Sequence, residues 1–205
     1  MANPATHIIL SEVFLQQHSA IERNSFLLGT SLPDIRYLDT SIPKNKYHKA
    51  DVDLQEVLQQ TTDFEKGIFF HSFIDRRRDM FYIERGVYVW GGDELFITAL
   101  KCLEDEVLYE KCTYRSEVSQ VFKEEWKNLT LDENRATLQI RYEALAQYFT
   151  TPISEETRTI VMQTCAFPLP LIQQINQKVQ EIKKDKELLA LIAKFYMFYS
   201  AFLVL

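Results

Sequence analysis

The chain has 205 residues, which suits one domain around a single core, residues 1–205, and is too short for two comfortable ones. Hydrophobic residues make up 46% of it, while five glycines and six prolines leave few turns, which argues against an all-β fold and favours helices. The formal net charge of -6 argues against a general affinity for nucleic acids, because that affinity needs an excess of lysine and arginine.

The first fifty residues are predicted to form two helices and a long loop. Asn3, followed by a proline, is a typical helix start, so a helix is expected over residues 3–17. A second, near 20–30, should end before Pro33, because the residue that precedes a proline disfavours helical backbone. Residues 31–50 are then expected to form a loop, and loops of this length in small domains are often functional.

The most apolar helix of the chain is expected to begin at a capping box. Thr62 and Glu65 have the residue types and spacing with which two side chains bind the first free backbone N–H groups of a helix. This helix should run to about Arg85, and a shorter one over 51–60 should precede it. A pair of glycines at 91–92 marks the next break.

The rest of the chain is also predicted to be helical, because apolar residues recur there at three- and four-residue spacing. Thr130 and Glu133 supply a second capping box. The last segment carries one charge in eighteen residues, so it is expected either to pack on the core or to contact or enter a membrane. The expected helices are 93–111, 114–127, 131–149, 154–165, 171–184 and 188–205. The predicted fold is an all-α, multi-helix single domain.

Three histidines and two aspartates have the pattern of metal ligands. His71 and Asp75 are four residues apart on the apolar helix, so they share one face and can bind one ion. Asp34 and His48 lie in the long loop, which can fold over that helix and complete a set of nitrogen and oxygen ligands for zinc or a similar divalent ion. His7 stands among apolar residues, where a hydrogen-bonded core histidine is the alternative.

The same residues have interpretations without metal. In a metal-free core, Asp75 would form a hydrogen bond with His71 or a salt bridge with Arg78. Arg36 and Arg76 each follow a proposed ligand closely and are candidate phosphate-binding residues, because a guanidinium binds phosphate oxygens in a two-pronged way. The alternative for the arginine run that begins at Arg76 is an exposed helix end paired with nearby acids.

Glu104, Asp105 and Glu106 form the one compact acidic cluster at a plausible distance from the proposed ligands. Carboxylates alone would favour magnesium, manganese or calcium over zinc. We expect a solvated helix face there instead.

Cysteine usage and the N-terminus indicate a compartment. Cys102, Cys112 and Cys165 are an odd, scattered set without a CxxC spacing. They predict reduced, partly buried thiols rather than a disulfide framework or a zinc knuckle. The N-terminus lacks the basic region of a secretory signal, and its apolar stretch is interrupted. A cytoplasmic location is therefore expected.

Five segments form a further pattern: Pro4 to His7, Phe26 to Gly29, Pro33 to Ile35, His48, and Gly67 to Asp75. These segments together resemble the zinc-dependent phospholipase C family. The resemblance covers roughly residues 3–80, and nothing beyond residue 80 is recognised. The family is all-helical and is similar in fold to the zinc nucleases that cut single strands. Helical phosphohydrolases of the HD type are disfavoured, because the chain has no adjacent His-Asp pair.

The resemblance implies that Asp34, His48, His71 and Asp75 bind one zinc ion. It also implies that Asp75 bridges to a second ion, which His7 binds too. Paired ions would polarise a phosphoryl group and lower the pKa of a bound water, which Asp34 would orient or deprotonate. The implied function is a phospholipase C-like hydrolase of phosphate esters that uses one or two divalent ions, with a phospholipid among the candidate substrates.

The chain departs from the family in two respects. Members hold a third zinc with a later pair of histidines and a glutamate, but no histidine follows His71 here. Members also begin with a tryptophan that binds metal, whereas this chain begins with Met1 and Ala2, and removal of Met1 would leave a free amine not far from His7. The alternative function is a non-catalytic protein that keeps the fold and binds metal, lipid or a partner. The segment 188–205 is a candidate for contact with a membrane surface.

Overall fold

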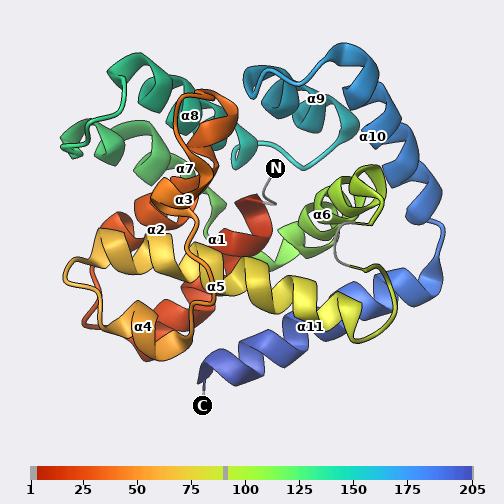
Figure 1. Ribbon diagram of the computed structural model, residues 1–205, viewed down its shortest axis with the longest axis horizontal. Coiled ribbons are helices and arrows are strands. Elements are labelled where there is room, and N and C mark those ends of the chain that lie inside the picture. The colour runs from red at the N-terminus through yellow and green to blue at the C-terminus, as the bar shows by residue number, and fades with distance from the viewer. Residues whose placement is uncertain (1–3, 90–91, 205) are drawn as a thin grey trace.

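The computed structural model describes residues 4–89 and 92–204, and every regular element within these ranges is a helix (Figure 1). The all-α prediction is therefore confirmed. The α-helices are α1 (Pro4–Gln17), α2 (Arg23–Ser31), α3 (Lys44–Tyr47), α4 (Leu54–Leu58), α5 (Asp63–Ile83), α6 (Glu94–Leu108), α7 (Arg115–Glu124), α8 (Arg135–Tyr148), α9 (Glu155–Thr164), α10 (Leu169–Ile182) and α11 (Lys186–Val204). The 3-10 helices are η1 (Pro33–Tyr37), η2 (Tyr109–Lys111) and η3 (Glu125–Asn128).

The long helix α5 crosses the middle of the molecule, and the other helices pack around it and α1 (Figure 1). Helix α1 contacts α2, α5, α6 and α11, so it lies at the centre of the fold. Helices α7 and α8 pack against each other on one side, and α9 and α10 lie on the other side, where α10 contacts α6. The start of α1 and the middle of α5 therefore lie where the two sides meet.

Helix α5 begins at the predicted capping box. Thr62 Oγ1 accepts a hydrogen bond from the Glu65 backbone N–H at 3.1 Å, and the Glu65 carboxylate accepts one from the Thr62 N–H at 3.1 Å. The box satisfies two N–H groups that a helix start leaves without an intrahelical acceptor. The predicted helix start is thus confirmed, and the helix ends two residues before Arg85.

The second predicted capping box is wrong. Helix α8 is capped by Asn134, whose side-chain oxygen accepts a hydrogen bond from the Ala136 N–H at 2.8 Å. Glu133 has another role, because its carboxylate is buried and accepts hydrogen bonds from Lys46 and Tyr47. Glu133 thus makes a tertiary contact with α3 and does not cap α8.

Two predicted boundaries also differ in the first half of the chain. The predicted loop 31–50 contains two short helices, η1 and α3, because Pro33 starts a 3-10 turn directly after α2. The predicted helix over 51–60 is reduced to α4, which starts at a capping box between Asp53 and Glu56. Two other predicted features, a cap at Asn3 and a break that includes Gly91, fall partly or wholly outside the described residues.

Helices α2 and α5 form the most extensive helix contact, and two glycines allow it. A Cβ atom on Gly29 would lie 2.0 Å from the backbone oxygen of Phe64, and one on Gly67 would lie 2.1 Å from the backbone oxygen of Phe26. Real side chains do not tolerate such distances, so only glycine permits this crossing. The close approach places the C-terminal half of α2 against the first turns of α5.

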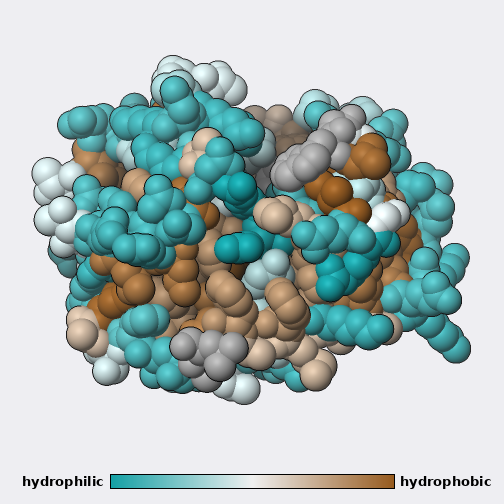
Figure 2. Space-filling view, turned by 60° about the horizontal axis from the view of Figure 1, so that its bottom comes forward, coloured by the Kyte–Doolittle hydropathy of each residue, from teal (hydrophilic) through white to brown (hydrophobic). Residues whose placement is uncertain are grey.

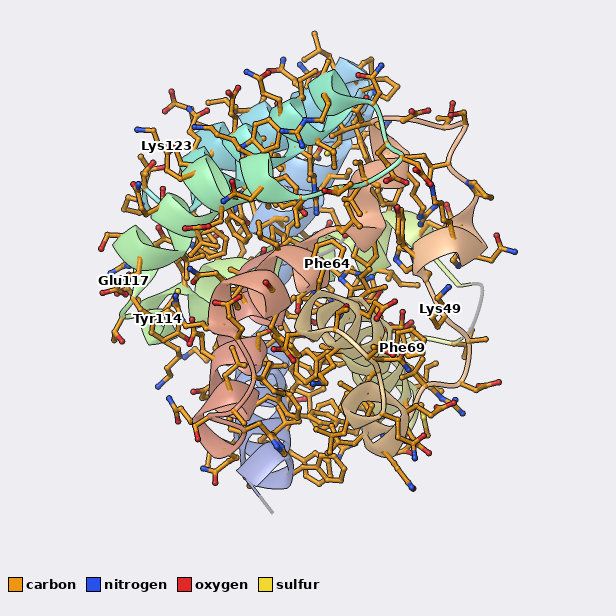
Figure 3. All side chains as sticks on the ribbon, turned by 90° about the vertical axis from the view of Figure 1, so that its left-hand side faces the viewer. Lys49, Phe64, Phe69, Tyr114, Glu117 and Lys123 are labelled. Carbon is orange, nitrogen blue, oxygen red and sulfur yellow. The ribbon has the colours of Figure 1, made fainter. Side chains whose placement is uncertain are left out.

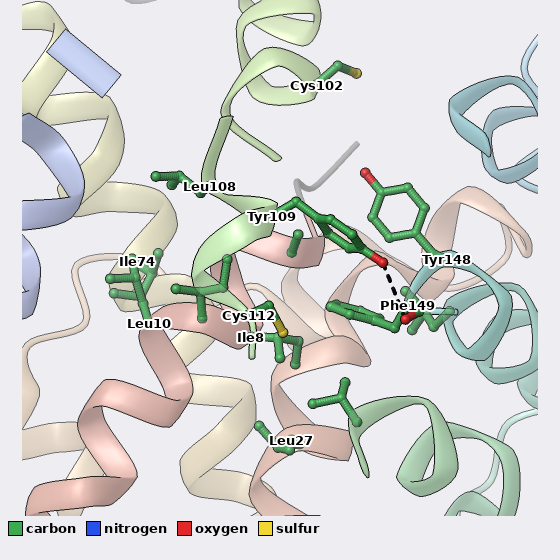
Figure 4. Close-up of a cluster of buried hydrophobic side chains, with 14 of the residues drawn as sticks. Ile8, Leu10, Leu27, Ile74, Cys102, Leu108, Tyr109, Cys112, Tyr148 and Phe149 are labelled. Atoms are coloured by element: carbon green, nitrogen blue, oxygen red, sulfur yellow. Dashed lines mark hydrogen bonds between the residues drawn. The ribbon is translucent and has the colours of Figure 1, made fainter. Parts of the chain in front are cut away.

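The core extends from this crossing into the second half of the chain (Figure 4). Ile8 from α1 and Ile74 from α5 are buried together with Leu108 from α6. Tyr109 is buried beside them and donates a hydrogen bond from its hydroxyl to the Phe149 backbone oxygen at 3.3 Å. The three cysteines are all buried and free, as predicted.

Helix α11 packs on the core with one stripe of its surface. The expectation that the apolar C-terminal segment packs on the core is therefore confirmed. The buried stripe consists of Leu188, Ile192, Phe195, Tyr199 and Leu203. No helix within the described residues is long and apolar enough to cross a membrane. The opposite side of α11 leaves Met197 and Phe198 exposed, and hydrophobic residues gather over the lower part of the face that carries this helix (Figure 2).

Asp105 on α6 holds the first turn of α1. Its carboxylate accepts hydrogen bonds from the Ala5 N–H at 3.1 Å, from the Thr6 N–H at 2.8 Å and from the Tyr148 hydroxyl at 2.9 Å. Carboxylates are favourable at this end of a helix because the N–H groups there are unpaired and the helix dipole is positive. Burial nevertheless raises the pKa of Asp105 to about 7.

We predict that Gly67→Ala destabilises the protein by about 2–3 kcal/mol, because the added methyl group forces α2 and α5 apart. Urea unfolding measures this. The control is Gly86→Ala, where a Cβ atom meets nothing within 4 Å and the change only strains a backbone φ of 70°, at roughly 1 kcal/mol. Equal effects of the two changes would contradict the steric explanation.

We predict that Asp105→Asn lowers the free energy of unfolding by about 1–3 kcal/mol, because an amide cannot accept all of these hydrogen bonds. The same unfolding measurement applies. Asp132→Asn is the matched control, since Asp132 is exposed, and we expect a change within about 0.5 kcal/mol. A similar response of the two variants would show that Asp105 does not hold α1.

Candidate metal centre

The five side chains predicted to bind metal come together in the folded chain, although they lie on separate elements. His71 and Asp75 lie one turn apart on α5, His7 on α1, Asp34 on η1, and His48 directly after α3. The loop with Asp34 and His48 folds back over α5. Two overlapping groups have ligand atoms within 4.8 Å of one another: His7, His71 and Asp75, and Asp34, His48 and His71.

His71 is held in one orientation by the helix crossing. Its Nδ1 lies 2.8 Å from the backbone oxygen of Thr30, at the end of α2, and donates a hydrogen bond to it. Nε2 is therefore the atom that faces the cluster. Burial would lower the pKa of His71, but the Asp75 and Asp34 carboxylates raise it above its ordinary value, so a metal ion at Nε2 would replace a proton there. The side chain is only 1% exposed, so Nε2 is directed into the protein.

Asp75 directs its two carboxylate oxygens to different sides. Oδ2 lies 3.4 Å from His71 Nε2 and 3.9 Å from His48 Nε2. Oδ1 lies 3.5 Å from His7 Nε2. One carboxylate therefore contributes an oxygen to each side of the cluster, as a bridging residue would.

The segment that carries His48 is fixed by neighbours on both sides. The Lys49 N–H donates to Ser72 Oγ at 2.9 Å, which ties the loop to α5, and Lys49 lies beside Phe69 of the same helix (Figure 3). On the other side, Tyr47 donates to the buried Glu133. His48 Nε2 then lies 3.6 Å from Asp34 Oδ1.

His7 is buried, as the core alternative expected, and it is also part of the cluster. Its ring stacks on that of His71, with centroids 4.2 Å apart and an interplanar angle of 16°. His18 is the remaining histidine; it lies after the end of α1, and its ring contacts that of Phe14 in a tilted arrangement instead. The resemblance implied this placement, whereas the apolar sequence around His7 alone did not, because it follows from the packing of α1 against α5.

The spacing of these atoms is compatible with a divalent ion. Nitrogen and oxygen ligands of tetrahedral zinc lie about 2.0–2.1 Å from the ion and therefore roughly 3.3 Å from one another. Three separations, from His71 to Asp75, from His48 to Asp34 and from His48 to Asp75, are 3.4, 3.6 and 3.9 Å. Hydrogen bonds are shorter. Among the described residues, buried His71 Nε2 and Asp75 Oδ1 make no hydrogen bond.

The charged side chains of the cluster shift one another's pKa values. Burial alone would raise the pKa of Asp34, but the charges of His71 and Arg141 hold it well below its ordinary value. The pKa of Asp75 is lowered as well, since Lys101 and His71 outweigh its burial. Burial and the charge of His71 lower the pKa of His48 to about 4, which keeps this imidazole neutral and able to bind metal.

Arg36, Arg76 and Arg78 differ in exposure and in the residues that they contact. Arg76 is partly exposed and forms an ion pair with Asp51 at 2.5 Å at the rim of a cleft. Arg36 stacks on the ring of Tyr37 and donates a hydrogen bond to its hydroxyl at 2.6 Å. Arg78 is completely buried and pairs with Glu104 at 2.8 Å. It therefore neither lies at an exposed helix end nor forms the salt bridge with Asp75, the two alternatives that the sequence suggested.

The expected solvated face at residues 104–106 is wrong. Glu104 is 0% exposed because it pairs with Arg78, and Asp105 is 1% exposed because it caps α1. Glu106 pairs with Arg158 at 2.7 Å and with Lys183. These carboxylates serve internal contacts, so the cluster offers no separate carboxylate site for a metal.

Two cations beside the cluster were not found from the sequence. Lys101 on α6 places Nζ 3.7 Å from Asp75 Oδ1, and Arg141 on α8 places a guanidinium nitrogen 4.0 Å from Asp34 Oδ2. Arg141 also donates two hydrogen bonds to the Ser31 backbone oxygen. Both residues are distant in sequence from the ligands, and no local pattern marks them.

Two hollows flank the cluster. A cleft of about 510 Å³ is lined by His48 and Asp75 together with basic residues that include Lys44, Lys49 and Arg76. A second cavity, of about 320 Å³, is largely apolar and is lined by Lys101, Tyr37, Phe167, Leu171 and Ile175, among others. Asp75 and Lys101, which contact each other, thus belong to different hollows.

Comparison with family models, with curated proteins and with solved structures found no match for the chain. Met1 and Ala2, whose amine the sequence suggested as a ligand near His7, lie outside the described residues. The assignment of a metal therefore depends on the geometry of the side chains alone.

We predict that the protein binds zinc and that saturating zinc raises its Tm by roughly 10 °C, because an ion that binds only the folded state stabilises it. Thermal unfolding with zinc and with a chelator measures this. His71→Gln and Asp75→Asn should abolish the shift, whereas His18→Gln should retain it. A shift that survives in both ligand variants would place the ion elsewhere.

Proposed function

We propose that this chain is a metal-dependent hydrolase of phosphate esters, related in ancestry to the zinc-dependent phospholipases C. Its metal would be held by Asp34, His48, His71 and Asp75, with His7 available to a second ion. One observation supports the proposal most: nitrogen and oxygen atoms of this set converge at separations of 3.4 to 3.9 Å, which are longer than ordinary hydrogen bonds and close to the spacing around a zinc ion.

Zinc in this position would polarise a phosphoryl oxygen and lower the pKa of a nearby water molecule. Asp34 would orient that water. Because the neighbouring charges keep the pKa of Asp34 low despite its burial, this carboxylate accepts a hydrogen bond readily but takes up a proton poorly. Arg76, with 41% of its side chain exposed, would exchange Asp51 for a substrate phosphate at the rim of the cleft.

A substrate with both an anionic and an apolar part fits the surroundings. The cleft beside His48 carries basic side chains as well as the carboxylates of Asp51, Asp75 and Asp79, and the cavity beside Lys101 is lined mainly by apolar and aromatic ones. Met197 and Phe198 on α11, 69% and 52% exposed, are candidates for contact with a membrane surface. A phospholipid combines these properties, and a small phosphodiester is the simpler member of the same class.

A non-catalytic metal-binding or lipid-binding role is the second candidate. It is favoured by the absence of any histidine after His71, which removes the third zinc site of the family. It is also favoured by residues 104–106, whose carboxylates are all engaged in internal contacts. Such a protein would keep the fold and one ion without turnover.

We predict that the zinc-loaded protein hydrolyses bis(p-nitrophenyl) phosphate or phosphatidylcholine in vesicles, and that a chelator abolishes the activity until zinc is restored. Asp34→Asn should lower kcat by about 10²-fold or more, because it removes a ligand and the group that orients water. Asp132→Asn is the control. Zinc binding without hydrolysis of either ester would favour the non-catalytic role.

A further inference from the structure

Lys101 is placed where a second metal ion would have to bind. Its Nζ lies 3.7 Å from Asp75 Oδ1, the same oxygen that faces His7 Nε2 at 3.5 Å. The Lys101 side chain is 17% exposed, so its stem is packed and the ammonium is held in place rather than extended into solvent. A cation already occupies the side of Asp75 that faces away from His71.

The described ligands are too few for two ions. His71 belongs to both candidate groups, but its Nδ1 is engaged by the Thr30 oxygen at 2.8 Å, so only Nε2 can bind metal. An ion held with Asp34 and His48 would use that atom. The second group then retains two described ligand atoms, His7 Nε2 and Asp75 Oδ1, whereas protein zinc sites usually have three or four protein ligands.

We propose that Lys101 takes the place of the second divalent ion, so that the centre holds one metal and the ammonium group binds a phosphate oxygen of the substrate. The inference rests on the proposed function. An ammonium binds phosphate as a point charge and needs no further ligands.

The charges and the position of Lys101 support this role. Asp34 and Asp75 are balanced by Lys101 and Arg141, so a bound divalent ion leaves the site with net positive charge, which suits an anionic phosphate. Lys101 also lines the apolar cavity of about 320 Å³. Its ammonium therefore stands between the carboxylate and a space large enough for part of a substrate.

The number of bound ions tests the first half of the proposal. Native mass spectrometry of the full chain, loaded with zinc and then desalted, should find one zinc ion in the wild type. Lys101→Glu supplies a third ligand beside His7 and Asp75 and should bind two. Two ions in the wild type, or one in Lys101→Glu, would overturn the proposal. No zinc in the wild type would instead overturn the proposed function itself.

Binding of inorganic phosphate to the zinc-loaded protein tests the second half. Calorimetry should find that Lys101→Met weakens phosphate binding about tenfold or more, because a charged hydrogen bond is lost. Lys101→Arg should restore it, and Lys123→Met, at an exposed position on α7, is the control (Figure 3). If Lys101→Met binds one zinc ion and phosphate as the wild type does, Lys101 only forms a salt bridge and the proposal is wrong.

Discussion

The hydrogen bond between His71 and the backbone oxygen of Thr30 sets the geometry of the candidate centre. It exists because α2 and α5 touch through Gly29 and Gly67, which bring the end of α2 against the N-terminal half of α5. The bond fixes the ring and directs Nε2 toward Asp75, one helical turn away. The remaining candidate ligands then approach from α1 and from the loop that crosses α5. The contact between α2 and α5 thus determines both how these helices pack and how the His71 ring is oriented.

Asp75 is the residue on which the two sides of the centre meet. One oxygen faces His71 and His48, and the other faces His7 and Lys101. A carboxylate so placed can join two cations, and nothing in its geometry requires both of them to be metal ions. If one of them is an ammonium group, the protein needs fewer ligands and gains a cation that chelators cannot remove.

The sequence predicted most accurately those features that depend only on residues close together in the chain. The spacing of His71 and Asp75 and the capping box at Thr62 both follow from the period of a helix, and both were found as expected. The resemblance covered residues 3–80, and its two glycines have a plain packing role in the helix crossing. The environment of residues 104–106 was predicted wrongly, because it depends on Arg78, which comes from another helix. Lys101 and Arg141 were missed for the same reason, since only the tertiary fold brings them to the ligands.

Helix α6 connects the centre to the second half of the chain. Lys101 and Asp105 are four residues apart on it and so share one face, from which the first reaches Asp75 and the second holds the start of α1. All candidate ligands lie within the first 75 residues, yet their supports come from α6 and α8. A graft of residues 3–80 onto another helical scaffold would transfer the ligands without these supports. The centre belongs to the whole domain and is not a portable module.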